Sequence, residues 1–145
     1  MSTRLGERGR HIGRLLIEAQ RRFNEGLIAR LHDRGYTDIR AAHGAVFANI
    51  DAQGARASEL ARRADMTKQA MAELIDDLEA KGYVERRPDP LDGRAHIVVL
   101  TQRGRRVDRV AAAVIGELER GYERLLGQDG LLKLKEGLER LLDAR

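Results

Sequence analysis

Residues 57–106 read ASELARRADMTKQAMAELIDDLEAKGYVERRPDPLDGRAHIVVLTQRGRR. The first half predicts a short helix over Ser58–Ala64, the tight turn Asp65-Met66-Thr67 and a second helix for which Thr67 is a favourable N-cap. The second helix carries one apolar stripe and ends at Lys81-Gly82, where a cation and a glycine are typical of a C-terminus. Two helices around a turn of a few residues predict a helix-turn-helix.

The second half of this stretch changes period. Tyr83–Arg87 can extend, Pro88–Gly93 is dense in turn residues, and His96–Leu100 is strongly β-prone. This pattern predicts a β-hairpin with a polar, proline-bearing tip. A hairpin after a helix-turn-helix is a wing, so we expect a winged helix-turn-helix lobe over residues 37–101.

Amphipathic helices are expected on both sides of the lobe. Apolar residues recur at three- and four-residue steps over His11–Leu31, and Gly35 follows that helix. Thr37 or Asp38 can cap the next helix, whose buried face would hold Ile39, Ala42, Val46, Phe47 and Ile50. On the other side, Thr101 can cap a long helix to Leu125, and a last helix carries Leu131, Leu134, Leu138, Leu141 and Leu142 on one side.

The expected fold class is therefore mainly α with a small β-hairpin wing, in one domain over residues 1–145. The outer helices, 8–34 and 102–145, are too long and too apolar to be covered by so small a lobe. We therefore expect them to be dimerisation helices, covered by a second copy of the chain.

Composition excludes several classes of function. The chain of 145 residues has no cysteine, which excludes disulfides, thiolate metal sites and thiol-based redox sensing. Its four histidines have no short ligand spacing, so neither a metal nor a cofactor is predicted. No apolar run approaches the roughly 20 residues needed to cross a bilayer, and we expect a cytoplasmic protein. A formal charge of +4 permits nucleic-acid binding without proving it.

The start of the second helix in the helix-turn-helix carries side chains that can read bases. Gln69 can pair with adenine through two hydrogen bonds, Lys68 can reach guanine or phosphate, and a small alanine can meet a thymine methyl group. The candidate readers are Thr67, Lys68, Gln69, Ala70 and Ala72.

The hairpin region is rich in arginine. Residues 86–106 hold six arginines against two aspartates. At the expected tip, Arg94 can enter a narrow minor groove, where the negative potential is strongest, and Asp92 would hold it in position. Arg87 is expected to contact phosphate regardless of sequence, and Arg86 and Ser58 complete the predicted DNA-binding set.

Together these residues resemble the MarR family (multiple antibiotic resistance regulator) of bacterial winged helix-turn-helix transcription regulators. The resemblance covers nearly the whole chain and is most specific at six segments: 58–61, 67–70, 78–79, 82–86, 92–94 and 100–104. It implies a homodimer whose outer helices intertwine and whose two lobes straddle a pseudo-palindromic DNA site, with the counterpart of Arg94 reading the minor groove. Half-site centres should then lie about 10 base pairs apart, or a multiple of that.

The resemblance also implies a ligand-responsive repressor that releases DNA when a small aromatic or anionic compound binds between the dimerisation helices and the lobe. Candidate anchors are His43 and Phe47 on the second helix, with His11 and Arg14 on the first. A core role remains the alternative for both His43 and Phe47. With only two Phe, three Tyr and no Trp, any pocket would have mainly aliphatic walls.

One departure from the family pattern is acidic. Many members have a basic residue where this chain has Glu73, and Asp76 and Asp77 follow on the same helix, where they would repel phosphate. This acidic face supports an alternative function, a winged protein-interaction module without specific DNA binding. An enzyme is not predicted: His32-Asp33 is better read as a helix end, and no activated nucleophile or Gly-rich phosphate loop is present.

Overall fold

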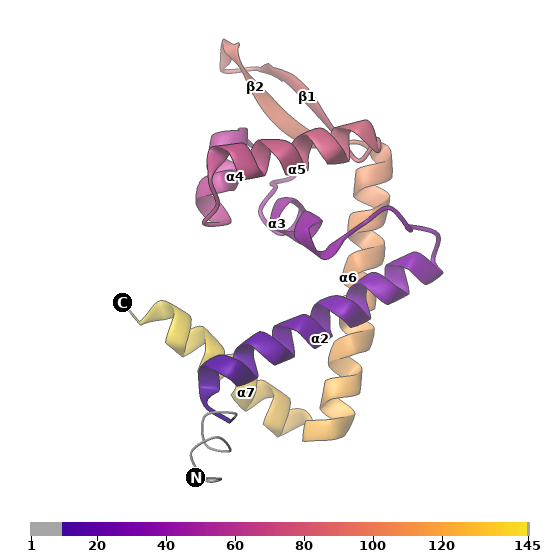
Figure 1. The fold of residues 1–145 in the computed structure, drawn as a ribbon, viewed down its shortest axis with the longest axis vertical. Coiled ribbons are helices and arrows are strands. Elements are labelled where there is room, and N and C mark those ends of the chain that lie inside the picture. Colours follow the sequence, from indigo (N-terminus) through magenta and orange to yellow (C-terminus); the bar gives the residue numbers. More distant parts are fainter. Residues whose placement is uncertain (1–9, 145) are drawn as a thin grey trace, which may run out of the picture.

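The computed structural model describes residues 10–144 (Figure 1). The elements follow in the order α2 (Ile12–Asp33), η1 (Ala41–His43), α3 (Gly44–Phe47), α4 (Ala57–Arg63), α5 (Lys68–Ala80), β1 (Val84–Asp89), β2 (Asp92–Leu100), α6 (Gln102–Leu126) and α7 (Gln128–Asp143). The ends of the predicted dimerisation helices, residues 8, 9 and 145, lie outside the described residues.

The elements form a lobe and an arm joined by α6. In Figure 1, α3, α4, α5 and the hairpin gather at one end of the molecule, and α6 runs from the hairpin to the opposite end. There α2 packs across α6, and α7 turns back to lie near the beginning of α2. The winged helix-turn-helix fold predicted from the sequence is confirmed.

The helix-turn-helix forms from local signals. Thr67 Oγ1 accepts a hydrogen bond from the Ala70 N–H at 3.1 Å, which confirms the predicted N-cap. Asp65 takes a positive φ of 52°, a conformation that aspartate tolerates, and so permits the tight turn. At the far end of α5, Gly82 has a φ of 83° and lets the Tyr83 N–H donate to the Leu78 carbonyl at 2.9 Å.

The hairpin is longer than predicted and its tip is shorter. Strands β1 and β2 pair antiparallel up to Asp89 and Asp92, with an irregularity after Pro88, so the tip is only Pro90-Leu91 and not the whole segment 88–93. The proline ring is tolerated because Pro88 lies on β1, an edge strand that pairs with β2 on one side.

A third segment joins the hairpin. Ala55 and Val98 exchange both backbone hydrogen bonds, at 3.0 and 2.8 Å. Beside them Gly54 has a φ of 92°, and a Cβ there would lie 2.6 Å from the Val98 carbonyl oxygen. Only glycine fits this approach, which fixes the wing to the start of α4.

The prediction for residues 37–50 was wrong in part. No continuous helix starts at Thr37 or Asp38. Thr37 and Asp38 form a turn, the backbone is extended at Arg40, and the short helices η1 and α3 follow. The Arg40 N–H donates to His43 Nδ1 at 2.9 Å, while the Asp38 carboxylate accepts from the Tyr83 hydroxyl at 2.5 Å. The Asp38 side chain, a candidate helix cap, thus binds Tyr83 instead.

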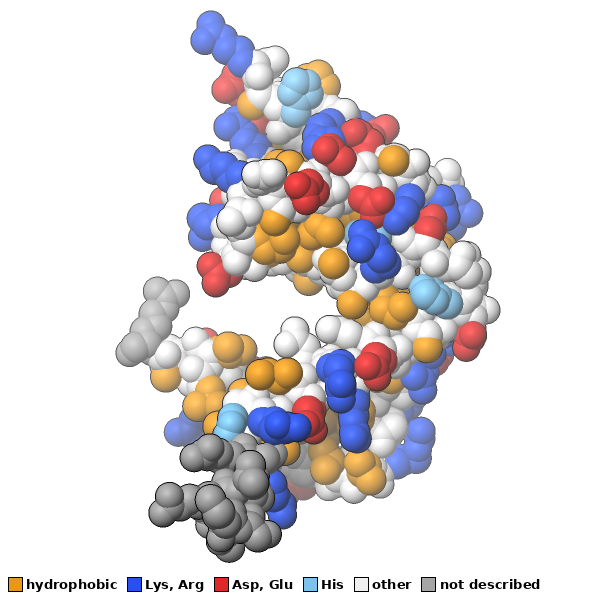
Figure 2. Space-filling view, in the orientation of Figure 1, with side chains coloured by type: hydrophobic (Ala, Val, Ile, Leu, Met, Phe, Trp, Pro, Cys, Tyr) orange, Lys and Arg blue, Asp and Glu red, His pale blue; other side chains and the backbone are white. Residues whose placement is uncertain are grey.

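The apolar core lies within the lobe and extends along α2 and α6. It includes Leu31, Ile39, Val46, Leu60, Met71, Ile75, Leu78, Tyr83, Val98, Val107 and Val114. By contrast, α7 has no buried residue. The exposed large apolar side chains concentrate on α7, the first half of α2 and the end of α6, and Figure 2 shows part of this orange surface on the arm. The arm therefore presents an uncovered apolar face.

Candidate nucleic-acid interface

The first turn of α5 presents the predicted base-reading residues together. Thr67, Lys68 and Gln69 are exposed, and Ala70 and Ala72 are half-buried beneath them. Within residues 10–144, neither the Lys68 nor the Gln69 side chain makes a hydrogen bond or ion pair, so both are available to a partner. The exposed backbone N–H groups of this helix end also favour an anion such as phosphate.

The Arg86 side chain is held by ion pairs within the fold. Its guanidinium pairs with Asp76 at 2.7 Å and with Glu79 at 2.8 Å, and its backbone N–H donates to Glu79 at 3.0 Å. Arg86 therefore ties β1 to the second half of α5. A phosphate contact by this side chain would have to compete with two carboxylates already in place.

Asp77 is also neutralised within the fold. Its Oδ2 accepts hydrogen bonds from Lys81 Nζ at 2.8 Å, from His43 Nε2 at 2.6 Å and from Arg40 Nη2 at 3.3 Å. These donors, Lys81 first and then His43, hold the pKa of the Asp77 carboxyl well below its usual range. The expected repulsion of phosphate by Asp76 and Asp77 is thus weakened, because Asp76 also pairs with Arg86. Glu73 is exposed and, within residues 10–144, has no ion pair.

The wing tip is held by its own carboxylates. Asp89 Oδ1 accepts from the Leu91 N–H at 2.9 Å, and Asp92 Oδ1 accepts from the Arg94 N–H at 3.1 Å. Asp92 therefore holds Arg94 through its backbone and leaves the guanidinium exposed. Arg87 is exposed on β1 and pairs with Glu85.

Two structural clusters escaped the sequence analysis. Arg56, exposed in part at the start of α4, binds the nearly buried Asp89, and Ser58 lies nearby on the same exposed surface. Arg103 was counted with the wing charges, but it stands 4.2 Å from the centre of the Tyr83 ring and donates to the Tyr83 hydroxyl at 2.9 Å. Both depend on partners far away in sequence, which no spacing rule reveals.

The four predicted ligand anchors are not brought together. His43 is fully buried and both its ring nitrogens have partners, Arg40 and Asp77. His11 accepts the Arg14 N–H at the start of α2, and Arg14 pairs with Glu18 at 3.0 Å. Of the four, Phe47 lines a recess described below. Its ring also packs edge-on against the Tyr83 ring, with 6.3 Å between the ring centres.

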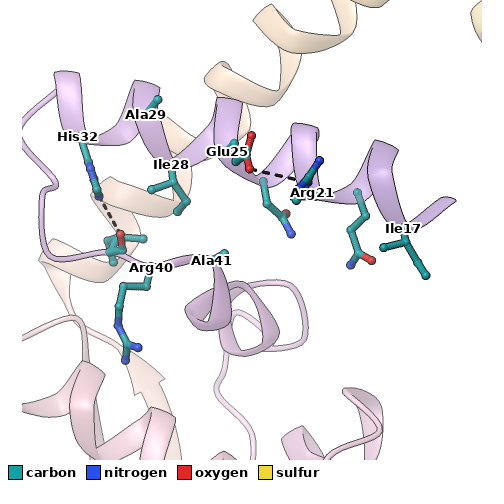
Figure 3. Close-up of a pocket in the computed structure, with 11 residues that line it drawn as sticks. Ile17, Arg21, Glu25, Ile28, Ala29, His32, Arg40 and Ala41 are labelled. Atoms are coloured by element: carbon teal, nitrogen blue, oxygen red, sulfur yellow. Dashed lines mark hydrogen bonds and ion pairs between the residues drawn. The ribbon is translucent and has the colours of Figure 1, made fainter. Parts of the chain in front are cut away.

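The groove lies between α2 and the segment that leads into η1, with a volume of about 690 Å³ (Figure 3). Its walls include Ile17, Arg21, Glu25, Ile28, His32, Ile39 and Arg40. His32 Nε2 lies 3.0 Å from the Ile39 carbonyl oxygen, which joins the two sides at one end. A recess of about 80 Å³ shares Ile28, Ile39 and Arg40 with the groove and continues to Leu27, Leu31, Phe47, Val107 and Asp108.

Two further observations concern the described residues alone. Among residues 10–144, no three His, Asp or Glu side chains lie close enough to hold a metal ion. No helix in that range combines the length and apolar character that a bilayer span requires.

Comparison with known proteins gives a family match over the lobe and a fold match over nearly the whole chain. Residues 37–95 match the sequence model of the MarR family. The transcriptional repressor CouR bound to a 23-mer DNA duplex is 26% identical, with a TM-score of 0.79, over 95% of this chain and 96% of that one. Reduced MarR from E. coli is 25% identical, with a TM-score of 0.76, over 91% and 96%.

A third structure has a bound small molecule. CouR from Rhodococcus jostii RHA1 bound to p-coumaroyl-CoA is 22% identical, with a TM-score of 0.74, over 94% of this chain and 95% of that one. At this identity the likeness concerns the fold. No curated protein sequence matches the chain.

Proposed function

Since this chain belongs to the MarR family of transcription regulators, we propose that it is a repressor that binds a duplex operator as a homodimer and releases it when a small effector binds. One observation carries the proposal. The free side chains of Lys68 and Gln69 begin α5, and α5 packs against the hairpin that exposes Arg94 (Figure 1).

This arrangement suits a division of labour on duplex DNA. A helix of the width of α5 fits the major groove, where its first turn meets base edges, while the adjacent wing reaches the minor groove. CouR, which shares this fold over nearly its whole length, is described on a DNA duplex. Thr67, Ala70, Ala72 and Arg87 complete the proposed contact surface, and Arg86 supports it from behind through Asp76 and Glu79.

The arm is proposed as the dimer interface. Leu15 and Leu16 on α2 and Leu134, Leu138, Leu141 and Leu142 on α7 line one apolar groove of about 870 Å³. An exposed apolar surface of this kind is unfavourable in water and typical of an interface. A second copy of the same arm would cover it, and twofold symmetry would then impose a pseudo-palindrome on the operator.

The groove of Figure 3 is proposed as the effector site. It lies where the arm meets the lobe, so a ligand there contacts both. Its mainly aliphatic walls suit an apolar body, and Phe47 supplies one aromatic contact in the recess. Catalysis is not part of the proposal, because the grooves present no nucleophile held by a base.

A footprint of the purified protein on the DNA beside its own gene tests this function. We expect protection over two half-sites about 10 base pairs apart, or a multiple, with affinity that falls steeply as salt is added. Arg94→Ala is the matched control because it leaves the arm intact. Uniform, unprotected DNA at low salt, or binding that ignores salt, would favour the interaction-module alternative instead.

A further inference from the structure

We propose that Glu73 on α5 selects a cytosine in each operator half-site by accepting a hydrogen bond from the N4 amino group of that base. The inference rests on the proposed function and adds to it a residue that determines specificity and the base that this residue reads. Glu73 lies near the middle of the helix that we assign to the major groove, beside the hairpin (Figure 1).

Glu73 shares one face of α5 with Gln69. The two residues are four positions apart, which makes them neighbours on the surface of a helix, and both are exposed. The opposite face of α5 is buried in the core through Met71, Ile75 and Leu78. A helix that presents Gln69 to the base edges therefore presents Glu73 to them as well.

The other acidic side chains of α5 are engaged within the fold. Asp76 and Glu79 both pair with Arg86, at 2.7 and 2.8 Å, and Asp77 accepts the three hydrogen bonds described above. In the part of the chain that the structure describes, Glu73 is exposed and has neither an ion pair nor a hydrogen bond. Its carboxylate oxygens are therefore open to a partner.

The chemistry of the base edges makes cytosine the partner of a carboxylate. An ionised carboxylate can only accept hydrogen bonds. In the major groove, guanine offers the acceptors N7 and O6, thymine offers the acceptor O4, and adenine places its N7 acceptor beside its N6 amino group. Cytosine presents an amino donor with no acceptor beside it on the same base. Glu73 thus gains a hydrogen bond at cytosine and meets repulsion at guanine and thymine.

The negative charge of Glu73 also affects affinity for DNA of any sequence. Phosphate groups repel a carboxylate, whereas the exposed Lys68 and Arg94 attract them. At a cytosine, the hydrogen bond offsets part of the repulsion. Glu73 therefore increases the difference in affinity between the operator and other duplexes, while it lowers affinity for both.

The spacing of Gln69 and Glu73 predicts where the cytosine lies. Four residues of an α-helix rise about 6 Å, and successive base pairs are about 3.4 Å apart. The base pair that Glu73 contacts should therefore lie within about two base pairs of the one that Gln69 contacts.

The test measures affinity for every single-base-pair variant of one half-site in the footprinted operator. For the wild type, we expect one position, near the one that Gln69→Ala relaxes, where replacing C·G by T·A weakens binding at least about fivefold. Replacing that cytosine by 2-pyrimidinone, which lacks the N4 amino group, should also weaken binding. In Glu73→Ala both effects should fall below about twofold, while the other positions keep their preferences.

Two further variants complete the test. Glu73→Gln should bind adenine at that position at least as tightly as cytosine, because glutamine pairs with adenine through two hydrogen bonds. Glu136→Ala is the matched control, since it removes the same charge at an exposed position of α7 and should leave every base preference unchanged. Affinity for a scrambled duplex should rise in Glu73→Ala and not in this control. Thermal unfolding of each variant separates these effects from loss of the fold.

Several results would overturn the inference. These are an unchanged base profile in either Glu73 variant, a wild-type preference for a base other than cytosine at the position that Glu73→Ala relaxes, or an equal gain in affinity of Glu73→Ala for operator and scrambled duplexes. Each leaves the proposed function standing, provided that the wild type protects its operator. Absence of an operator footprint would instead contradict the proposed function itself.

Discussion

Arg56 donates two hydrogen bonds, from Nε at 3.0 Å and from Nη2 at 2.8 Å, to the Oδ2 atom of Asp89. The other oxygen of the same carboxylate accepts the Leu91 N–H at 2.9 Å. One nearly buried carboxylate thus joins the start of α4 to the tip of the wing. The backbone N–H of Leu91 and the Arg56 guanidinium both hold the pKa of Asp89 below its usual range.

Arg56→Lys should loosen the wing tip. Lysine keeps the charge but lacks the planar fork that binds Asp89 through two nitrogens. We expect faster amide hydrogen exchange at residues 91–94 and weaker operator binding, by a smaller factor than for Arg94→Ala. Arg62→Lys is the control, because Arg62 pairs with Glu59 inside α4 and does not contact the wing. Equal exchange in both variants would show that Arg56 does not hold the tip.

Three substitutions should separate base-specific contacts from phosphate contacts that do not depend on sequence. Arg94→Ala is expected to weaken specific binding by about 1–3 kcal/mol without changing the dimer. Gln69→Ala should relax the preference at one base position in each half-site. Arg87→Ala should weaken all sequences alike and reduce the slope of affinity against salt by about one. Binding assays on specific and scrambled duplexes over a salt series measure the effects of all three substitutions. Identical profiles for Gln69→Ala and Arg87→Ala would refute the separate roles of base reading and phosphate contact.

The parts of the fold that sequence predicted are those with local causes. The Thr67 cap, the helix end at Lys81-Gly82 and the β-prone run His96–Leu100 act within a few residues, and the helix-turn-helix and wing follow from them. The same is true of the amphipathic helices α2, α6 and α7, whose period is evident without a partner.

Sequence reasoning falls short where the structure of a residue depends on a partner far away in the sequence. Asp38 was expected to cap a helix, but its carboxylate binds Tyr83, 45 residues away. The phosphate contact of Arg86 stays a prediction, but the sequence did not show that Asp76 and Glu79 pair with this side chain. For the same reason the acidic face of α5 was interpreted as unpaired charge. The effector groove was sought at His43, whose ring the core fully covers. The groove that we propose for the effector is lined instead by α2 and by the segment that leads into η1, which only the folded chain brings together.

His43 should make stability depend on mildly acidic pH. Burial lowers its pKa, while its hydrogen bond to Asp77 opposes that shift and the nearby Lys81 and Arg40 charges reinforce it. The unfolded chain therefore takes up the proton first as pH falls below about 6.5. Since protons then favour the unfolded state, stability present at neutral pH is lost as the pH falls toward the folded pKa.

The measurement is the melting temperature at several pH values from about 7.5 down to 5.5, the range that spans the ordinary histidine pKa. In His43→Gln the side chain still offers a donor to Asp77 but cannot titrate, so this part of the pH dependence should disappear even if the variant is less stable throughout. His96→Gln, at an exposed position on β2, is the control. A wild-type slope retained in His43→Gln would contradict this prediction.

Gly104→Ala should destabilise the lobe. A Cβ at Gly104 would lie 2.0 Å from the Tyr83 carbonyl oxygen, so α6 would have to move away from the end of α5. We expect a loss of about 1–3 kcal/mol or more in the free energy of unfolding, as for other overpacked sites. Gly116→Ala, in the same helix, meets only the Arg120 guanidinium at 3.5 Å and should gain stability. Urea denaturation compares the two, and equal losses would show that the close approach is not the cause.

Leu142→Glu should break the proposed dimer. Leu142 on α7 is 82% exposed in the single chain and lies in the apolar groove shared with α2. If a second arm covers it, a carboxylate there must be buried without a partner, which costs at least about 1–3 kcal/mol and raises the dimer dissociation constant roughly tenfold or more. Sedimentation velocity across a concentration series measures this shift.

Leu91→Glu is the matched control for the arm. Leu91 is even more exposed, at 95%, but it lies at the tip of the wing, far from α7 along the molecule (Figure 1). The same change of charge should therefore leave the dimer intact and weaken DNA binding, because a carboxylate at the wing tip faces phosphate. A monomeric wild type, or dimers equally weakened by both substitutions, would remove the arm as the interface and with it the reason for expecting a pseudo-palindromic operator.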